Sequence, residues 1–425
     1  MRIEPFRGFR YRPGGRVDVR AQHREGALDV SEVVAPPYDQ ISPAMQDVLY
    51  GMSAANIVRV TLPKDPTEGE GVGDRYAAAR QTLDGWMATR TWGAEERAAI
   101  YPYTQTYRVG GHEVTRAGFI ALGAVSEYGR GIVWPHERTH AEPKADRMRL
   151  LETTGADTGL LFMLVSDPDG ALRAATAPGG APILEARDLK SERHRVWRVD
   201  APAAVARVQA LMADRTVVIA DGHHRYETAV AYARERPAAA LKLMAFFALE
   251  APGLTIFPNH RLVRDVPGFA LPRLLESARR WFEIGALDDP PAFRATPTTL
   301  GVVTAAGAAT LTLRRDGAAA IPWPASTSAA WRGLSVSILH EGVLRPLLGI
   351  TDAMLEAKSH VEYTADQAEA IAVARAGGCQ AAFLIAPTTP AELLAVVRAG
   401  EILPQKSTHF YPKLLDGLVF HRLPA

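Results

Sequence analysis

The stretch Thr216–Glu227, TVVIADGHHRYE, decides the fold around it. Its first five residues are β-branched or small and apolar, which is typical of a short buried strand. Asp221 and Gly222 follow as a tight turn, because glycine permits backbone angles that other residues avoid. The residues from Tyr226 to Arg236 are then expected to form a helix. The sequence therefore predicts a strand, a turn and a helix N-terminus in direct succession.

This helix N-terminus predicts an anion site. The first N–H groups of a helix have no intrahelical acceptor, and the helix dipole adds partial positive charge there. His223, His224 and Arg225 place up to three cationic donors at the same point, which favours phosphate. Gly222 lets the backbone approach a ligand closely. Asp221, the only carboxylate of the loop, is expected to cap the helix, orient a histidine or hold Mg²⁺ through the phosphates.

A purely structural interpretation of the loop stays open beside the functional one. An Asp-Gly turn before a helix is common, with the aspartate as N-cap. Adjacent histidines do not point the same way on a helix, and no His-x-x-x-His spacing or cysteine partner supports a metal site here. We favour a ligand site because four polar groups follow a buried strand, the place where α/β sheets bind ligands.

The residues around this stretch predict a mixed sheet in an N-terminal domain of residues 1–255. Alternating or apolar runs indicate strands, and helical spacing of apolar residues indicates helices. The sequence Val109-Gly-Gly-His112 is a hairpin signal between two of the strands. The expected strands are 56–62, 99–107, 115–123, 159–165, 195–199, 216–220 and 241–249, and the expected helices are 74–90, 146–154, 202–212 and 226–236.

A second domain of residues 256–425 is predicted to have α/β layering. Prolines and small residues crowd the segments 266–272 and 288–299, which indicates a boundary in this region. Strands are expected at 299–304, 310–315, 361–364 and 381–386, with helices at 366–376 and 390–399 between and after them. The segment 334–348 is expected to be an amphipathic helix that Pro346 ends or kinks. The predicted fold class is therefore α/β, of the mixed α+β kind.

Two further loops are candidate sites. Lys406, Ser407 and Thr408 resemble a phosphate-binding cluster without the glycines of a P-loop, and an ordinary loop packed by its aromatic residues is an equal alternative. Glu137 follows Pro135 and His136, a suitable arrangement for a general base and its support, although a solvated loop with salt bridges explains it as well. Asp39, after Pro-Pro-Tyr, is open to the same two interpretations.

Composition excludes several classes of function. The 425 residues carry 48 Lys and Arg against 47 Asp and Glu, so no basic excess favours nucleic acid or anionic lipid. The single cysteine, Cys379, allows no internal disulfide and argues against thiolate metal and dithiol redox sites. The sequence shows no secretory signal and no apolar stretch of membrane-spanning length. We therefore expect a soluble cytoplasmic protein without membrane or nucleic-acid partners; the sequence does not predict its oligomeric state.

A series of motifs along the chain resembles a known family. In this order and together, they are similar to the bacterial and archaeal family catalogued as domain of unknown function 1015. The motifs are Pro5–Phe9, Ala35–Asp39, Asn56–Arg59, Pro135–Thr139, Ala220–Glu227, Ser337–Glu341, Pro404–Thr408 and Phe410–Lys413.

The Asp-Gly-His-His-Arg element also resembles the phosphate-binding element of the ParB/sulfiredoxin superfamily, and free-serine kinases most of all. Sulfiredoxins need a cysteine where this chain has His223. The resemblance implies a nucleotide-dependent small-molecule kinase acting on free serine or a similar hydroxylated metabolite, with ATP or ADP and Mg²⁺. A phosphohydrolase and a non-catalytic nucleotide-binding regulator stay as alternatives.

Under that resemblance each candidate residue has an expected role. Gly222, His223, His224 and Arg225 hold the nucleotide phosphates. Asp221 binds Mg²⁺ or accepts a proton, Glu137 is the alternative base, and Lys406, Ser407 and Thr408 close the phosphate end.

Overall fold

The computed structural model describes residues 1–12, 29–66, 73–137 and 142–423, which form two compact units. Unit 1 comprises Met1–Pro135, Thr139–Leu254 and Pro412–Ala425, so the C-terminal tail returns to it. Unit 2 comprises His136–Arg138 and Thr255–Tyr411. The predicted domains 1–255 and 256–425 stay a prediction.

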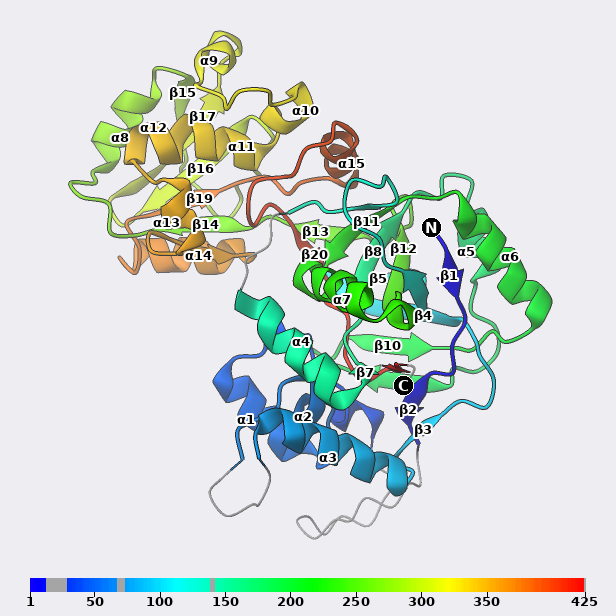
Figure 1. The fold of residues 1–425 in the computed structure, drawn as a ribbon. Coiled ribbons are helices and arrows are strands. Elements are labelled where there is room, and N and C mark those ends of the chain that lie inside the picture. The colour runs from blue at the N-terminus through cyan, green and yellow to red at the C-terminus, as the bar shows by residue number, and fades with distance from the viewer. Residues whose placement is uncertain (13–28, 67–72, 138–141, 424–425) are drawn as a thin grey trace. The chain divides into compact units, whose positions relative to one another are not determined.

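Unit 1 is built on a nine-stranded mixed sheet (Figure 1). The strand order is β6-β11-β8-β12-β5-β4-β10-β9, and β1 pairs with β5. β11 runs antiparallel to β8, and β8 runs parallel to β12. The strands are β1 (Ile3–Glu4), β4 (Tyr101–Val109), β5 (His112–Ala124), β6 (Val133–Trp134), β8 (Leu161–Val165), β9 (Leu184–Arg187), β10 (Arg193–Val196), β11 (Val217–Asp221) and β12 (Leu241–Ala248), with the two-stranded pairs β2 (Phe9–Tyr11)–β3 (Trp92–Ala94) and β7 (Ala156–Asp157)–β21 (His421–Arg422).

Helices pack on this sheet and on one another. In Figure 1, α7 lies in front of the strands with α4 beside it. The apolar sides of β8, β11 and β12 share one buried cluster with Tyr226 of α7, and this cluster fixes the helix that follows β11. The helices are α1 (Pro43–Met52), α2 (Val58–Thr61), α3 (Arg75–Ala88), α4 (Glu142–Thr154), α5 (Ala171–Ala175), α6 (Pro202–Ala213) and α7 (His223–Glu235), with single 3₁₀ turns at Val30–Glu32, Tyr38–Gln40 and Pro237–Ala239.

Unit 2 has a six-stranded sheet of order β15-β17-β16-β19-β14-β18, in which every pair is antiparallel. Its strands are β14 (His260–Val263), β15 (Phe282–Ala286), β16 (Thr299–Thr304), β17 (Gly307–Leu313), β18 (Val361–Thr364) and β19 (Ala381–Leu384), with the pair β13 (Thr255–Phe257)–β20 (His409–Tyr411). Its helices are α8 (Leu271–Ala278), α9 (Arg315–Ala320), α10 (Ala329–Arg332), α11 (Ser335–Leu339), α12 (Arg345–Leu348), α13 (Asp352–Glu356), α14 (Gln367–Arg375) and α15 (Pro390–Arg398).

The mixed α/β fold is confirmed, but the strand predicted at 56–62 is wrong. Val58–Thr61 form one buried helical turn, α2, in place of the strand. The side chain of Asn56 accepts a hydrogen bond from the N–H of Val58 and donates to the carbonyl oxygens of Glu32 and Val34. These hydrogen bonds, together with burial, outweigh the β-propensity of the valines.

The helix predicted at 334–348 is present, but it contains a π-helical turn and is buried on all sides over most of its length. It consists of α11, a π-helical turn at His340–Leu344, and α12. The residues from Ser335 to Leu344 are all buried, so this stretch is not amphipathic. Pro346 lies in the first turn of α12, where a proline is tolerated, and Gly349 ends the helix with a φ of 69°.

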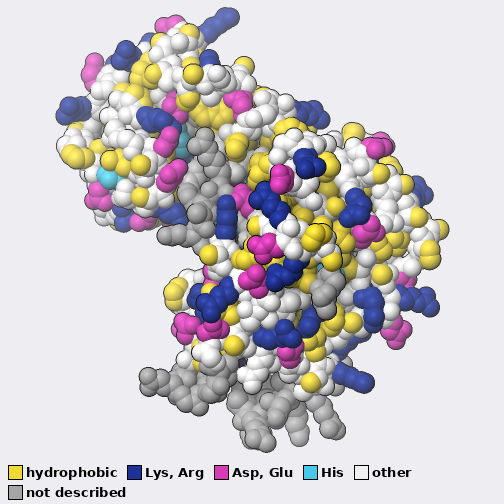
Figure 2. Space-filling view, viewed as in Figure 1, with side chains coloured by type: hydrophobic (Ala, Val, Ile, Leu, Met, Phe, Trp, Pro, Cys, Tyr) yellow, Lys and Arg dark blue, Asp and Glu magenta, His cyan; other side chains and the backbone are white. Residues whose placement is uncertain are grey.

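Positive and negative side chains are mixed on the face of the molecule that Figure 2 shows, where Lys and Arg lie interspersed with Asp and Glu.

Among the described residues, no helix combines the length and apolar character needed to cross a membrane.

Candidate functional site

The loop between β11 and α7 has the predicted strand–turn–helix form, but the helix begins three residues earlier than expected, at His223. Gly222 is the N-cap residue and has φ 94° and ψ 27°, in the left-handed region. A Cβ atom at this position would lie 2.7 Å from Cδ2 of Leu161 and 3.2 Å from Cζ of Arg225. Both the backbone angle and the close contact therefore require glycine.

Asp221 is not the N-cap. It is the last residue of β11, and the N-cap residue of α7 is Gly222, which has no side chain of its own to cap the first turn. A register shift between Ile219 and Asp221 interrupts the pairing of β11 with β8, and such bulges change the direction of a side chain. One carboxylate oxygen of Asp221 lies 3.8 Å from Arg225 and 3.6 Å from Nζ of Lys413. The carboxylate is therefore held between two cations.

Arg225 is the buried cation of the loop, with 8 % of its surface exposed. Its Nη1 donates a 2.6 Å hydrogen bond to the carbonyl oxygen of Leu160. Burial lowers the pKa of Arg225, but the charges of Asp221, Asp416 and Asp39 outweigh this effect, so the net shift is upward. The side chain stays charged, and three carboxylates surround it.

The two histidines of the motif differ in exposure. His223 is buried and His224 is partly exposed. This difference agrees with the expectation that adjacent residues of a helix point in different directions.

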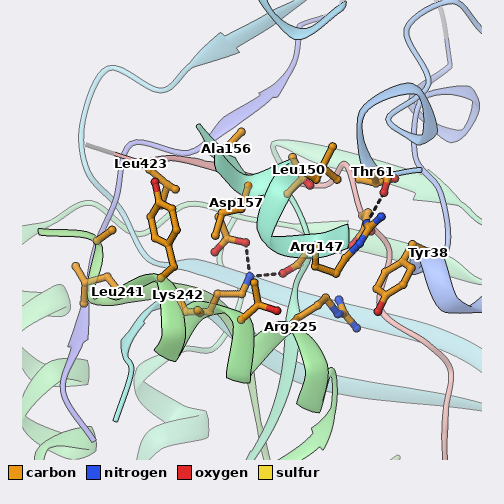
Figure 3. Close-up of a pocket in the computed structure, with 18 residues that line it drawn as sticks. Tyr38, Thr61, Arg147, Leu150, Ala156, Asp157, Arg225, Leu241, Lys242 and Leu423 are labelled. Atoms are coloured by element: carbon orange, nitrogen blue, oxygen red, sulfur yellow. Dashed lines mark hydrogen bonds and ion pairs between the residues drawn. The ribbon is translucent and has the colours of Figure 1, made fainter. Parts of the chain in front are cut away.

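A pocket in unit 1 adjoins this loop (Figure 3). Tyr38, Arg147 and Arg225 gather at one end of it, and Asp157 with Lys242 lies further along. Its free volume is about 70 Å³, which accommodates a few water-sized groups but not a whole nucleotide. The lining residues are Tyr38, Thr61, Arg147, Leu150, Leu151, Ala156, Asp157, Thr158, Gly159, Arg225, Thr228, Ala229, Tyr232, Ala239, Leu241, Lys242, Asp416 and Leu423.

Lys242 and Asp157 form a buried ion pair in this pocket. Nζ of Lys242 also donates to the carbonyl oxygen of Gly159 at 2.7 Å, and the second oxygen of Asp157 accepts from the N–H of Leu243 at 2.8 Å. Burial lowers the pKa of Lys242, against the raising effect of Asp157. These hydrogen bonds satisfy both charges, as buried charges require.

Asp416 is the least compensated charge of the pocket. It is 3 % exposed, and its Oδ1 has no hydrogen-bond partner among the described residues. Burial raises the pKa of Asp416 to about 7, although Arg225 and Lys242 act in the lowering direction. The carboxyl group therefore exchanges its proton near neutral pH.

Asp39 lies in unit 1, in the 3₁₀ turn Tyr38–Gln40, and its charge acts on Arg225.

The other predicted residues lie in unit 2, where the structure brings three of them together. Oε1 of Glu137 accepts a 3.3 Å hydrogen bond from the N–H of Ser407. Nε2 of His136 lies 2.8 Å from the hydroxyl oxygen of Thr408 and 3.7 Å from Oε1 of Glu137. Arg138 and Thr139 of this motif fall outside the described residues.

Lys406 has an exposed side chain and a φ of 56°. Its carbonyl oxygen accepts hydrogen bonds of 3.1 Å from Asn259 and from the buried Arg261. The loop is therefore fixed through its backbone, while the ammonium group extends from it.

The sequence does not predict Asp157, Lys242 or Asp416 as site residues, and Lys413 belongs to the motif Phe410–Lys413 without a role of its own. The sequence does contain a clue to Lys242, because this charged residue interrupts the otherwise apolar run 241–249. Such a residue is almost never buried unless it is paired. No local sequence pattern indicates Asp157 or Asp416, because both reach the site from distant parts of the chain.

Residues 3–337 match the family model described as "Protein of unknown function (DUF1015)". The chain belongs to this family. The match spans most of the chain and includes the loop from Asp221 to Arg225. No curated protein matches this chain.

Several solved structures are similar to this DUF1015 protein, at low sequence identity and low TM-score. A conserved hypothetical protein from Pyrococcus furiosus is 13 % identical, with coverage of 67 % of this chain and 89 % of that chain and a TM-score of 0.34. A free serine kinase in complex with AMP is 12 % identical, and the match covers 65 % of this chain and 83 % of that chain with a TM-score of 0.33. SbnI with a C-terminal truncation, from Staphylococcus aureus, is 10 % identical, and the match covers 70 % of this chain and 85 % of that chain with a TM-score of 0.36.

Proposed function

We propose that this protein is a nucleotide-dependent kinase that phosphorylates a small hydroxylated metabolite such as free serine. The observation that supports the proposal most directly is the first turn of α7, which follows a buried strand, starts at a left-handed glycine and carries a buried arginine. The N–H groups of a first helical turn and the helix dipole favour a phosphate at such a point. The free serine kinase structures hold ADP or AMP, the ligand class that we propose for this chain.

In this proposal the cations of the loop stabilise charge on the transferred phosphoryl group. The acceptor hydroxyl attacks the terminal phosphorus, its proton passes to a carboxylate, and the bond to the bridging oxygen of the nucleotide breaks. Positioning and electrostatic stabilisation provide most of the catalysis in such reactions. Gly222, His223, His224 and Arg225 are the residues that we assign to the phosphates.

Asp221 and Asp416 are the carboxylates that we assign to the proton and the metal. Mg²⁺ in nucleotide sites is held by one or two carboxylates together with phosphate oxygens. Asp221 meets this requirement at the end of β11, and Asp416 offers a buried oxygen without a hydrogen-bond partner among the described residues. The pKa of Asp416, raised by burial to about 7, also suits a general base at neutral pH.

The roles of the residues in unit 2 stay predictions. Glu137 is the alternative base, and Lys406, Ser407 and Thr408 are the candidates for additional phosphate contacts. Turnover by Glu137→Gln tests the first role, and nucleotide affinity of Lys406→Ala tests the second.

The decisive experiment incubates the protein with ATP or ADP and Mg²⁺, with and without a panel of amino acids. A kinase consumes nucleotide only in the presence of an acceptor and yields the phosphorylated acceptor. Consumption without acceptor would indicate a phosphohydrolase, and binding without consumption would indicate a regulator. Either of these results would refute the kinase proposal.

A matched pair of arginine variants tests the phosphate site. Arg225→Ala is expected to weaken nucleotide binding about 10- to 150-fold, because a charge-assisted hydrogen bond contributes about 1.5–3 kcal/mol. Arg234 lies on the same helix with its side chain 65 % exposed, so Arg234→Ala serves as the control. Equal nucleotide affinities of the two folded variants in calorimetry would exclude Arg225 from the site.

A further inference from the structure

The turn that joins β9 to β10 gathers three potential metal ligands away from the α7 loop. Asp188, Glu192 and His194 each offer one ligand atom, and these atoms lie within 4.8 Å of one another. Glu192 and His194 are buried, and Asp188 is partly exposed. A cluster of carboxylates alone would not indicate a metal site. The feature that does so is the buried imidazole ring of His194.

His194 is fully buried and incompletely hydrogen bonded. It is 0 % exposed, and its Nε2 has no hydrogen-bond partner among the described residues. Oδ2 of Asp188 lies 3.8 Å from this nitrogen, too far for a hydrogen bond. A buried polar atom without a partner is costly and requires an explanation, and a bound ion is one of the common reasons.

The second nitrogen of the ring is held in place. Nδ1 of His194 lies 2.7 Å from the hydroxyl oxygen of the buried Tyr103, and the two rings stack with centroids 6.0 Å apart. Histidines that bind metals almost always use their other nitrogen in a hydrogen bond of this kind, which fixes the ring orientation.

Asp188 is oriented in the same manner. Its Oδ1 accepts hydrogen bonds from the N–H groups of Lys190 at 2.9 Å and Glu192 at 2.8 Å. These bonds hold the turn and leave Oδ2 on the side of His194. Carboxylates that bind metals are likewise fixed by hydrogen bonds to their second oxygen.

We propose that Asp188, Glu192 and His194 bind a divalent first-row transition metal ion, through Oδ2, a carboxylate oxygen and Nε2. One imidazole with two carboxylates suits Zn²⁺, Mn²⁺ or Fe²⁺, whereas Mg²⁺ and Ca²⁺ prefer oxygen ligands alone. Metal–ligand distances of about 2.0–2.2 Å require the three atoms to approach one another slightly on binding. The partial exposure of Asp188 gives the ion a path from solvent.

The charge of the buried Arg116 opposes the ion, since it acts on both His194 and Glu192. Its guanidinium group is already engaged by Gln105 and by the carbonyl oxygen of Pro412, and it lies over the rings of Phe162 and Phe247. The carboxylates of Asp188 and Glu192 supply negative charge that a divalent cation balances.

Metal titration of the chelator-treated full chain tests the proposal independently of any kinase activity. We expect wild-type protein to bind one Co²⁺ or Zn²⁺ ion at this site, with visible absorption bands for Co²⁺ and a raised melting temperature. His194→Ala should remove the bands and weaken binding at least tenfold. Tyr103→Phe, which keeps the ring but not the hydroxyl, should weaken binding about 10- to 100-fold.

His112→Ala is the control, because His112 is an exposed histidine at the start of β5. If circular dichroism shows that His194→Ala does not fold, Glu192→Gln provides the test with a nearly isosteric side chain. Absence of stoichiometric binding by wild-type protein would overturn the proposal. Binding with the same spectrum in wild-type and in folded His194→Ala or Glu192→Gln protein would overturn it as well, since it would show surface adsorption only.

Discussion

Replacing Asp416 by asparagine removes the carboxyl group that is least compensated in the pocket, with little change of shape. Asp416 is 3 % exposed, and its Oδ1 has no hydrogen-bond partner among the described residues. Burial raises its pKa to about 7 despite the opposing charges of Arg225 and Lys242. An asparagine resembles the protonated form of this side chain and does not titrate.

The sign and size of the effect follow from this pKa. Between about pH 4 and pH 7 the carboxyl group is protonated in the folded protein and ionised in the unfolded chain. The folded state binds more protons in this window, so the free energy of unfolding falls as pH rises. The difference between about 7 and the ordinary value of 3.8 corresponds to about 4 kcal/mol.

Urea denaturation between pH 4.5 and pH 8 measures this contribution. We expect the free energy of unfolding of Asp416→Asn to fall by about 3 kcal/mol less than that of the wild type over this range, which covers most of the titration. Asp47→Asn changes an aspartate whose side chain is 71 % exposed and should keep the wild-type pH dependence. Parallel curves for the wild type and Asp416→Asn would refute the assignment of a raised pKa to this residue.

Three further substitutions test the neighbourhood of the loop. Gly222→Ala should lower the free energy of unfolding by about 1–3 kcal/mol more than Gly129→Ala in urea denaturation, because both positions have a φ near 90° but only Gly222 meets a neighbouring side chain. Lys242→Met should destabilise the fold by about 3–5 kcal/mol by leaving Asp157 without its partner, and the additional change Asp157→Asn should restore part of the loss. Asp221→Asn should reduce turnover strongly with little effect on melting temperature, since Asp221 is not the N-cap; normal turnover would remove it from the proposed mechanism.

The local part of the site could be predicted from the sequence. The succession of strand, glycine and helix at 216–236 depends on residues that are neighbours in the chain, and the structure contains it as β11, Gly222 and α7. The start of the helix was placed too late, because two histidines and an arginine carry no strong helical signal. The hairpin of β4 and β5 was predicted for the same local reason.

The segment 56–62 shows where local patterns fail. Its β-branched residues favour a strand, but hydrogen bonds from Asn56 to residues 32 and 34 determine the actual turn. Those partners are far away in the sequence, so propensity alone could not reveal them. The charges around Arg225 are even harder to predict from local patterns. Asp39 and Asp416, which act on this arginine, come from near the two ends of the chain.

The charges around Arg225 link the proposed phosphate site to the proton on Asp416. Asp221, Asp416 and Asp39 all act on Arg225, so a phosphate must compete with them for the same cation. When Asp416 is protonated, Arg225 and Lys242 lose one negative neighbour and attract an anion more strongly. An anion at this point in turn raises the pKa of Asp416 further, since like charges disfavour ionisation. On the proposed function, phosphate binding and proton uptake by Asp416 are therefore coupled, and Asp416 acts as the base only in those molecules in which it stays ionised while the nucleotide is bound.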